Sequence, residues 1–300
     1  MLVSVVIPCT NRIKGLERSI RSVLNQNFEG CVEIFLIENN SADRTEVVSL
    51  VSKLSDARVR HYYIEDCDNA NVARNFGAKL ANGDYIAFLD SDDEWLDCHL
   101  RTCLALICDN GGVFSSFYSV AAKSHSVVGG AFSGDIEYDL FVSKSVDIRT
   151  SVLFFLKSSF IDVMFDERLN KHQDWGLAVD FQKVHSLVYS SKPTVRIYTD
   201  CEGRMSAKTN FAASLFFLEN KISGHSRNNF IISRMADEIS IGSIESLRKY
   251  IQVLDFSFFG VTTKKKIAYI MFYISSLSKF SFYVVRNILY MYKSIFVANK

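Results

Sequence analysis

The stretch "GDYIAFLDSDDEWL", residues 83–96, places an apolar run directly before a cluster of acids. Residues 85–89 have the length and composition of a buried β-strand. Four acids follow within five residues, namely Asp90, Asp92, Asp93 and Glu94. Two carboxylates one residue apart on such a turn can face one hard cation, because Mg²⁺ and Mn²⁺ prefer oxygen ligands. The alternative is a solvated acidic turn that caps a helix beginning at Trp95.

The residues before this stretch alternate between strand-like and helix-like patterns. Strands are predicted at 3–8, 32–39, 59–65 and 85–90, and helices at 13–26, 41–54 and 71–83. This alternation predicts a parallel sheet covered by helices on both faces. Ligands bind at the carboxyl ends of the strands in such sheets. Asp90 to Glu94 stand at one of these ends.

The rest of the chain is less regular. Apolar runs between 97 and 165 predict further strands, partly antiparallel, and a helical pattern returns over 174–187. "VYSSKPTVRIYT", residues 188–199, is interpreted as a pair of strands. Residues 211–260 are predicted to be mostly helical. The fold class is therefore α/β, with a helical extension after it.

Composition narrows the class of protein further. The 300 residues carry a net charge of +1, so a general nucleic-acid binder is not expected. Seven scattered cysteines without a C-x-x-C pair favour buried thiols in a reducing compartment over a disulfide framework or a zinc site. The N-terminus lacks the basic region of a signal peptide. No uninterrupted apolar run reaches the length of a membrane-spanning helix, so we expect a cytoplasmic protein.

The charge is distributed unevenly along the chain. Asp255 is the last acid, and residues 256–300 hold seven Lys and Arg residues, which leaves a charge of −6 for the residues before them. Nine Phe and Tyr residues lie within 264–300. A helix of this composition is typical of in-plane binding at an anionic membrane surface. The alternatives are a helical hairpin packed on the catalytic domain and an interface with a partner.

Three motifs together resemble a known family. They are "VSVVIPCTNR" with "LERSIRSVLNQ" at the start, "IENNSADRT" after the second strand, and "NVARNFGAKLANGDYIAFLDSDDEWL" through the fourth. Their order and spacing are similar to those of the family-2 glycosyltransferases, enzymes of the GT-A fold. The resemblance is strong over residues 3–100 and thinner to about 205. It implies a GT-A catalytic domain over 1–210 and a helical C-terminal region over 211–300.

The resemblance also implies which residues bind the nucleotide-sugar donor. In that family the turn after the first strand wraps the base, and an acid that ends the second strand bonds to the base. The donor-binding residues implied here are Pro8, Thr10, Asn11, Glu38, Asn39, Arg74, Asp90, Ser91 and Arg204. The usual pair of aspartates is replaced by Glu38-Asn39, and uridine is the first choice of base because a carboxylate accepts from the uracil ring N–H.

The same resemblance assigns the acids. Asp90 and Asp92 match the D-x-D motif, which implies that they bind Mn²⁺ or Mg²⁺ with the donor diphosphate, and Asp93 supports them. Inverting transfer also needs a separate carboxylate to take the proton of the acceptor hydroxyl. "HQDW", residues 172–175, resembles the family's motif at a helix start, with Gln173 in place of the commoner glutamate. Asp174 is therefore the predicted general base.

We thus expect a metal-dependent inverting glycosyltransferase that moves a sugar, with UDP-sugar the first choice of donor, to a hydroxyl of a glycan or lipid-linked acceptor. The family resemblance favours bacterial surface polysaccharide synthesis at the inner face of the membrane. A nucleotidyltransferase is the first alternative, but "PCTNRIKG" lacks its typical phosphate loop. The second is a non-catalytic membrane scaffold, which the intact acids at 90, 92 and 174 argue against.

Overall fold

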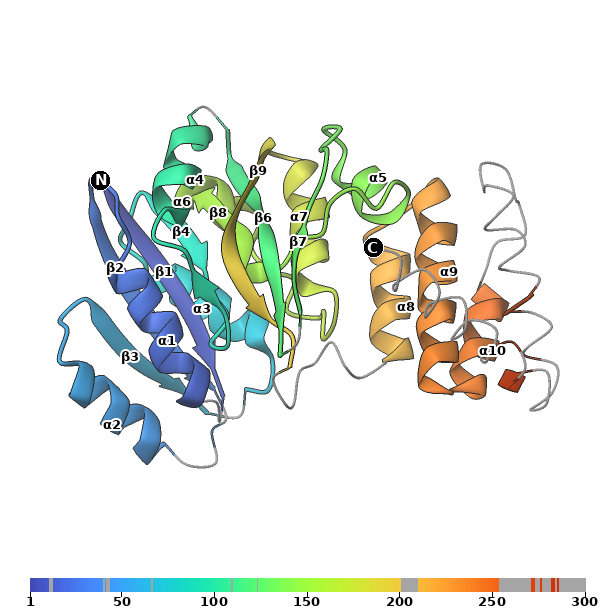
Figure 1. Cartoon of the computed structure of the whole chain (residues 1–300), viewed down its shortest axis with the longest axis horizontal. Coiled ribbons are helices and arrows are strands. Elements are labelled where there is room, and N and C mark those ends of the chain that lie inside the picture. Colours follow the sequence, from blue (N-terminus) through green and yellow to red (C-terminus); the bar gives the residue numbers. More distant parts are fainter. Residues whose placement is uncertain are drawn as a thin grey trace. The chain divides into compact units, whose positions relative to one another are not determined.

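The computed structural model describes residues 1–10, 13–39, 41, 44–65, 67–108, 110–122, 124–200 and 210–253, together with 271, 272, 276, 282, 283 and 285. The chain divides into two compact units, Met1–Met205 and Ser206–Lys300 (Figure 1). The assignment of catalysis to residues 1–210 remains a prediction. Within the described residues, no helix has the length and hydropathy to cross a membrane.

The first unit is built on one mixed sheet, with strand order β3-β2-β1-β4-β8-β6-β9-β5 and β7 paired to β6. Its strands are β1 (Leu2–Cys9), β2 (Cys31–Asn39), β3 (Val59–Ile64), β4 (Tyr85–Phe88), β5 (Glu94–Trp95), β6 (Gly112–Ala121), β7 (Ser124–Val128), β8 (Leu153–Leu156) and β9 (Leu187–Tyr198). The predicted parallel half is confirmed, because β1 pairs in parallel with both β2 and β4, and β2 with β3. The predicted antiparallel part is confirmed by β8, which runs against β4 and β6.

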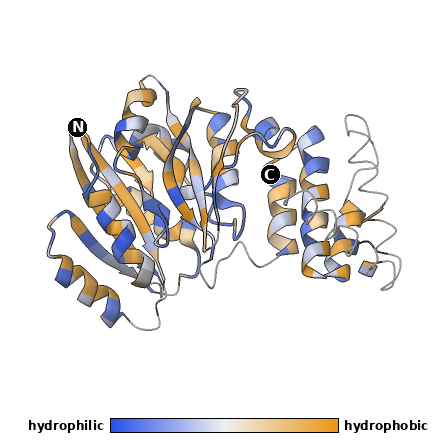
Figure 2. Cartoon of the chain, in the orientation of Figure 1, coloured by the Kyte–Doolittle hydropathy of each residue, from blue (hydrophilic) through white to orange (hydrophobic). Residues whose placement is uncertain are grey.

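Helices alternate with these strands (Figure 1). They are α1 (Ile13–Leu24), α2 (Thr45–Leu54), α3 (Ala70–Leu80), α4 (His99–Ile107), α5 (Ile136–Phe141), the 3-10 turn η1 (Thr150–Val152), α6 (Lys157–Val163) and α7 (Gln173–Gln182). Figure 2 colours the central strands mostly as hydrophobic, whereas the visible face of α1 is largely hydrophilic. In α1 the buried apolar residues are Leu16, Ile20 and Val23, which recur at helical spacing.

The predicted pair of strands at 188–199 is wrong, because β9 is one strand that pairs in parallel with β6 along both halves. The register is irregular between Ser115 and Phe117 of β6, opposite the part of β9 that contains Pro193. A proline nitrogen has no hydrogen to donate, so the ladder is interrupted there without ending the strand. This interruption is what the sequence pattern presents as two strands.

The second unit contains α8 (Phe211–Asn220), α9 (Gly224–Ile241) and α10 (Ile244–Val253). Their apolar faces pack together through ring contacts, with Phe217 and Phe230 centroids 5.2 Å apart and Phe211 and Tyr250 4.8 Å apart. The predicted helices are confirmed as far as Val253. Residues 254–260 and all but a few of the basic, aromatic residues after them lie outside the described residues.

The core beneath the acidic turn is aromatic. Phe88 is fully buried in β4, and its ring centroid lies 4.9 Å from that of Phe160, 5.1 Å from Phe165 and 6.4 Å from Phe155. This cluster joins β4 to β8 and α6. It therefore supports the strand from which Asp90 emerges.

Phe88→Ala is expected to lower the free energy of unfolding by about 3–5 kcal/mol, because it leaves a cavity among packed rings. Phe76→Ala on α3 is the matched control, since Phe76 is 36% exposed and leaves no enclosed cavity, and we expect a clearly smaller loss of about 1–2 kcal/mol. Urea denaturation followed by circular dichroism measures both. Similar losses in the two variants would contradict this account of the core.

Candidate active site

The acidic turn after β4 is held through its backbone. The amide of Asp93 donates to the carbonyl of Asp90 at 3.0 Å, which closes the turn. The Ser19 hydroxyl of α1 donates to the Asp93 carbonyl at 2.6 Å, and the Arg18 guanidinium donates to the Asp92 carbonyl. A Cβ on Gly15 would lie 2.6 Å from the Ser91 carbonyl oxygen, so α1 packs directly against the turn. The chain continues into the short strand β5, so the alternative of an acidic cap on a helix at Trp95 is wrong.

Arg74 joins the acidic turn to α7. Its Nη2 donates to Asp90 Oδ1 at 2.7 Å, and its Nη1 donates to Asn71 Oδ1 at 3.0 Å and to Gln173 Oε1 at 3.1 Å. The Arg74 side chain is 4% exposed, whereas that of Asp90 is 33% exposed. The sequence predicted Arg74 as a donor-binding residue, and the structure places its guanidinium inside this network. Contact with a donor remains a prediction.

Asp93 lies beneath the turn. Ser151 donates to its Oδ2 at 2.6 Å, and the Tyr198 amide donates to its Oδ1 at 3.3 Å. Burial raises the pKa of Asp93 well above its usual range, and the charges of Asp90 and Asp92 raise it further. Asp93 is therefore an anchor of the turn, while Asp90 and Asp92 carry its negative charge.

Asp174 lies in the first turn of α7, directly after the residue that Arg74 contacts. Burial raises the pKa of Asp174 to about 6, the charge of Arg149 lowers it, and the charges of Asp147 and Asp90 raise it. The carboxylate also accepts the Trp175 amide at 2.9 Å. The predicted base and the predicted metal turn thus lie within electrostatic reach of each other.

Two aromatic rings flank Gln173 and Asp174 in sequence, that of His172 just before α7 and that of Trp175 in its first turn. His172 has a left-handed backbone with φ of 59°, and its ring stacks on Trp175 at 5.1 Å with an interplanar angle of 14°. His172 is buried, and Trp175 is half-buried. Trp175 also packs edge-on against Phe141 at 5.5 Å.

The sequence analysis missed the segment 147–151. Ser151 bonds to Asp93, its Oγ accepts from the Asp90 amide at 3.1 Å, and its carbonyl accepts from the Trp95 indole at 2.8 Å. The charge of Arg149 lowers the pKa of Asp174, and the charge of Asp147 raises it. The short polar run "DIRTS" before the buried strand β8 was the available signal. This run lies between 97 and 165, where the apolar pattern is too irregular to assign individual strands and helices.

The predicted base-binding residues gather where β1 and β2 end. The Thr10 hydroxyl donates to the Asn39 carbonyl at 2.8 Å and contacts its Oδ1 at 3.0 Å, and the Asn39 amide donates to the Cys67 carbonyl at 3.0 Å. Pro8 pairs with Ile37 in the β1–β2 register. Asn11 and Arg204 lie outside the described residues.

Glu38 is fully buried at this end of β2. Its Oε2 lies 2.8 Å from His61 Nε2, and its Oε1 is buried without a hydrogen-bond partner. Burial raises the pKa of the neighbouring Cys9 thiol, and the charge of Glu38 raises it further. A buried carboxylate oxygen without a donor is costly, so a hydrogen bond to this oxygen would stabilise the site.

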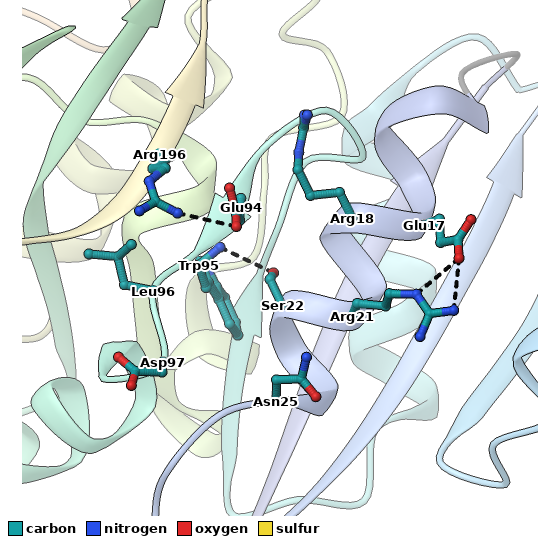
Figure 3. Close-up of a pocket in the computed structure, with 10 residues that line it drawn as sticks. All are labelled: Glu17, Arg18, Arg21, Ser22, Asn25, Glu94, Trp95, Leu96, Asp97 and Arg196. Atoms are coloured by element: carbon teal, nitrogen blue, oxygen red, sulfur yellow. Dashed lines mark hydrogen bonds and ion pairs between the residues drawn. The ribbon is translucent and has the colours of Figure 1, made fainter.

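A pocket of about 700 Å³ lies on another side of the turn, between α1, β5 and β9 (Figure 3). Glu17 pairs with Arg21 at 2.8 Å, and Glu94 pairs with Arg196 at 3.2 Å within it. The lining carries three acids and three arginines in all, so its net charge favours neither an anion nor a cation as ligand. None of the predicted donor, metal or base residues lines this pocket.

The metal site predicted from the sequence has two protein ligands, Asp90 and Asp92. Within the described residues, no group of three His, Cys, Asp or Glu side chains converges on one point. Asp90 and Asp92 therefore offer at most part of a coordination shell. Such a pair is what Mg²⁺ uses when phosphate oxygens and water complete its octahedron.

Comparison with known proteins identifies the family that the chain resembles. Residues 4–150 match the family model "Glycosyl transferase family 2". Poly(ribitol-phosphate) beta-N-acetylglucosaminyltransferase TarP of Staphylococcus aureus is 29% identical over 205 residues, covering 65% of this chain and 62% of TarP. The UDP-Glc:alpha-D-GlcNAc-diphosphoundecaprenol beta-1,3-glucosyltransferase WfaP of Escherichia coli is 31% identical over 136 residues, covering 45% of this chain and 53% of WfaP.

A solved structure resembles the fold over nearly the whole chain. Residues 1–349 of S. aureus TarS in complex with UDP-GlcNAc superpose with a TM-score of 0.57 at 16% identity, covering 94% of this chain and 83% of that one. The chain spans less than two thirds of the length of its curated relatives, from 28% to 64% of each of the first five.

Asp174→Asn is expected to stabilise the metal-free protein at pH 8 by on the order of 2 kcal/mol. The folded-state pKa of Asp174 is raised to about 6, so between about pH 4 and pH 6 the unfolded chain releases this proton before the folded chain does. The free energy of unfolding of the wild type therefore falls between about pH 4 and pH 6. Asp174→Asn has no proton to release and does not show this fall. The advantage of Asp174→Asn should therefore grow from pH 4 to pH 6 and then level.

Urea denaturation at a series of pH values with EDTA present measures this effect. Asp97→Asn is the control, because the Asp97 side chain is exposed and its substitution should change stability little at any pH. A pH-independent effect of Asp174→Asn would contradict the raised pKa.

Proposed function

Because the chain belongs to glycosyl transferase family 2, we propose that it transfers a sugar from a UDP-sugar to a hydroxyl group of a glycan or lipid-linked acceptor. The Arg74 network carries the proposal, since it links Asp90 to the residue before Asp174. The network thereby connects an acidic turn suited to a metal-bound diphosphate with a carboxyl group suited to proton transfer. The family match argues against the nucleotidyltransferase alternative.

Several observations support a uridine nucleotide. The buried Oε1 of Glu38 lacks a donor, and the ring N–H of uracil supplies one. The related WfaP is named as a UDP-Glc transferase, and TarS was crystallised with UDP-GlcNAc. Thr10 and Asn39 hold each other at the same sheet edge, which preserves a fixed turn against which a base can pack.

The acid turn fits a divalent cation. The charges of Asp90 and Asp92 are concentrated enough to raise the pKa of Asp93, and their oxygens suit Mn²⁺ or Mg²⁺. Asp92 and the remaining oxygen of Asp90 would hold the ion, since Arg74 occupies Asp90 Oδ1. Such an ion supplies positive charge that neutralises a diphosphate leaving group.

Asp174 acts as the general base in this proposal. It takes the proton of the acceptor hydroxyl while that oxygen bonds to the anomeric carbon and the bond from that carbon to the diphosphate oxygen breaks. Direct displacement inverts the anomeric centre. A pKa of about 6 leaves Asp174 largely ionised at neutral pH yet basic enough to accept a proton.

We also propose a pathway and a location. The named relatives act on poly(ribitol-phosphate) and on a diphosphoundecaprenol-linked sugar, which supports bacterial surface glycan synthesis on lipid-linked material. The seven cations and nine Phe and Tyr residues near the C-terminus suit peripheral binding to the cytoplasmic face of an anionic membrane.

A donor screen tests the enzyme. With Mn²⁺ and sugar nucleotides, release of free nucleotide diphosphate should be greatest for UDP-sugars, and EDTA should abolish it. Asp92→Ala should reduce the rate by about two orders of magnitude or more, whereas Asp97→Ala should leave it within about twofold. The proposal is overturned if no sugar nucleotide is consumed, or if Asp92→Ala has no effect.

Vesicle flotation tests the membrane proposal. The full chain should float with vesicles rich in phosphatidylglycerol and dissociate in high salt, because each surface cation contributes about 1 kcal/mol. A chain shortened to residue 260 should stay at the bottom of the gradient. Flotation of the shortened chain would assign the binding to other residues.

A further inference from the structure

The Asp147 carboxylate connects two segments that are distant in sequence. Its Oδ2 accepts Arg149 Nη2 at 2.7 Å and Nε at 3.1 Å, and its Oδ1 accepts the Trp175 indole Nε1 at 3.2 Å. Trp175 follows Asp174 in the first turn of α7. Asp147 and Arg149 are 24% and 35% exposed, so the pair lies at the edge of the site rather than in the core.

The same segment holds the acidic turn. Ser151, two residues after Arg149, bonds to the Asp90 amide and to the Asp93 carboxyl group. A shift of this segment would therefore change the turn and the start of α7 together. Residues 147–151 thus form a second link between the acidic turn and α7, in addition to Arg74.

Charged groups from two elements outside α7 act on Asp174. Asp90 lies after β4, and Asp147 and Arg149 precede η1. His172 precedes Asp174 at the N-terminus of α7, and Arg74 reaches that turn through Gln173. The positive charge of Arg149 lowers the pKa of Asp174 and so favours its ionised form. Burial and the carboxylates of Asp147 and Asp90 act in the opposite direction. The Arg149 guanidinium is fixed by Asp147.

We propose that Asp147 and Arg149 are positioning residues for the general base. Asp147 holds the Arg149 guanidinium and the Trp175 indole beside Asp174, and Arg149 maintains Asp174 as a carboxylate that can accept the acceptor's proton. This role rests on the proposed glycosyl transfer. It is separate from binding of the donor.

The pH dependence of kcat/KM tests the pair. The wild type should lose activity as pH falls through about 6, the pKa of Asp174. Arg149→Met should move this acid limb upward by about one pH unit, because it removes the cation that favours the ionised form. Arg149→Lys should keep the limb near its wild-type position. An unmoved limb in Arg149→Met would overturn the proposal.

A double-mutant cycle tests whether Asp147 acts through Arg149. Asp147→Asn and Arg149→Met should each lower kcat at pH 7, and the double variant should lose no more than the stronger single variant. UDP affinity should stay within about threefold of the wild type in all three, because the pair does not serve the donor. Independent, multiplicative losses in kcat would overturn the assigned role of Asp147.

A stability measurement separates this inference from the proposed function. In the otherwise wild-type protein, the stabilisation by Asp174→Asn should grow between about pH 4 and 6. In the Arg149→Met background it should keep growing to about pH 7, because the pKa of Asp174 is then higher. Arg168→Met is the matched control, since Arg168 is 69% exposed and pairs with Asp166, and it should leave the window unchanged. A wild type without transferase activity refutes the proposed function, whereas an unchanged stability window refutes the action of Arg149 on Asp174.

Discussion

The buried guanidinium of Arg74 is the constraint on which the site depends. It bonds at once to Asp90 at the end of the sheet and to Gln173 at the start of α7. A buried cation of this kind is tolerated only with partners, and removal of one partner leaves a costly unpaired charge. The positions of the acidic turn and of α7 are therefore coupled. Gln173 contributes an uncharged amide oxygen to Arg74, whereas Asp90 contributes a carboxylate that forms an ion pair with it.

The mixed topology of the sheet explains how distant segments meet here. β8 lies between β4 and β6 and runs antiparallel to both. The chain entering β8 consequently arrives at the edge where β4 ends. Residues 147–151 therefore lie at the acidic turn, where Ser151 accepts a hydrogen bond from the Asp90 amide and Asp147 contacts α7.

Carboxyl groups of one chemical type acquire different properties from their surroundings. Asp93 is buried and its pKa rises well above the usual range, while Asp90 is ion-paired and partly exposed. Asp174 has its pKa raised to about 6 by burial, with Arg149 acting against that rise. Such separation of acid environments allows one site to hold fixed negative charge and an exchangeable proton.

Residue types and periodicity were enough to predict the parallel half of the sheet, the acidic turn at its carboxyl edge and the helix that carries Asp174. These features depend on local periodicity and on residue types adjacent in the chain, so a one-dimensional pattern records them. Three sets of contacts could be found only in the folded chain: Arg74 bonds to Gln173, Ser151 supports Asp90 and Asp93, and Asp147 joins Arg149 to Trp175. Periodicity reports which side chains are buried, but the partner of a polar group is set by packing between elements that lie far apart in the chain.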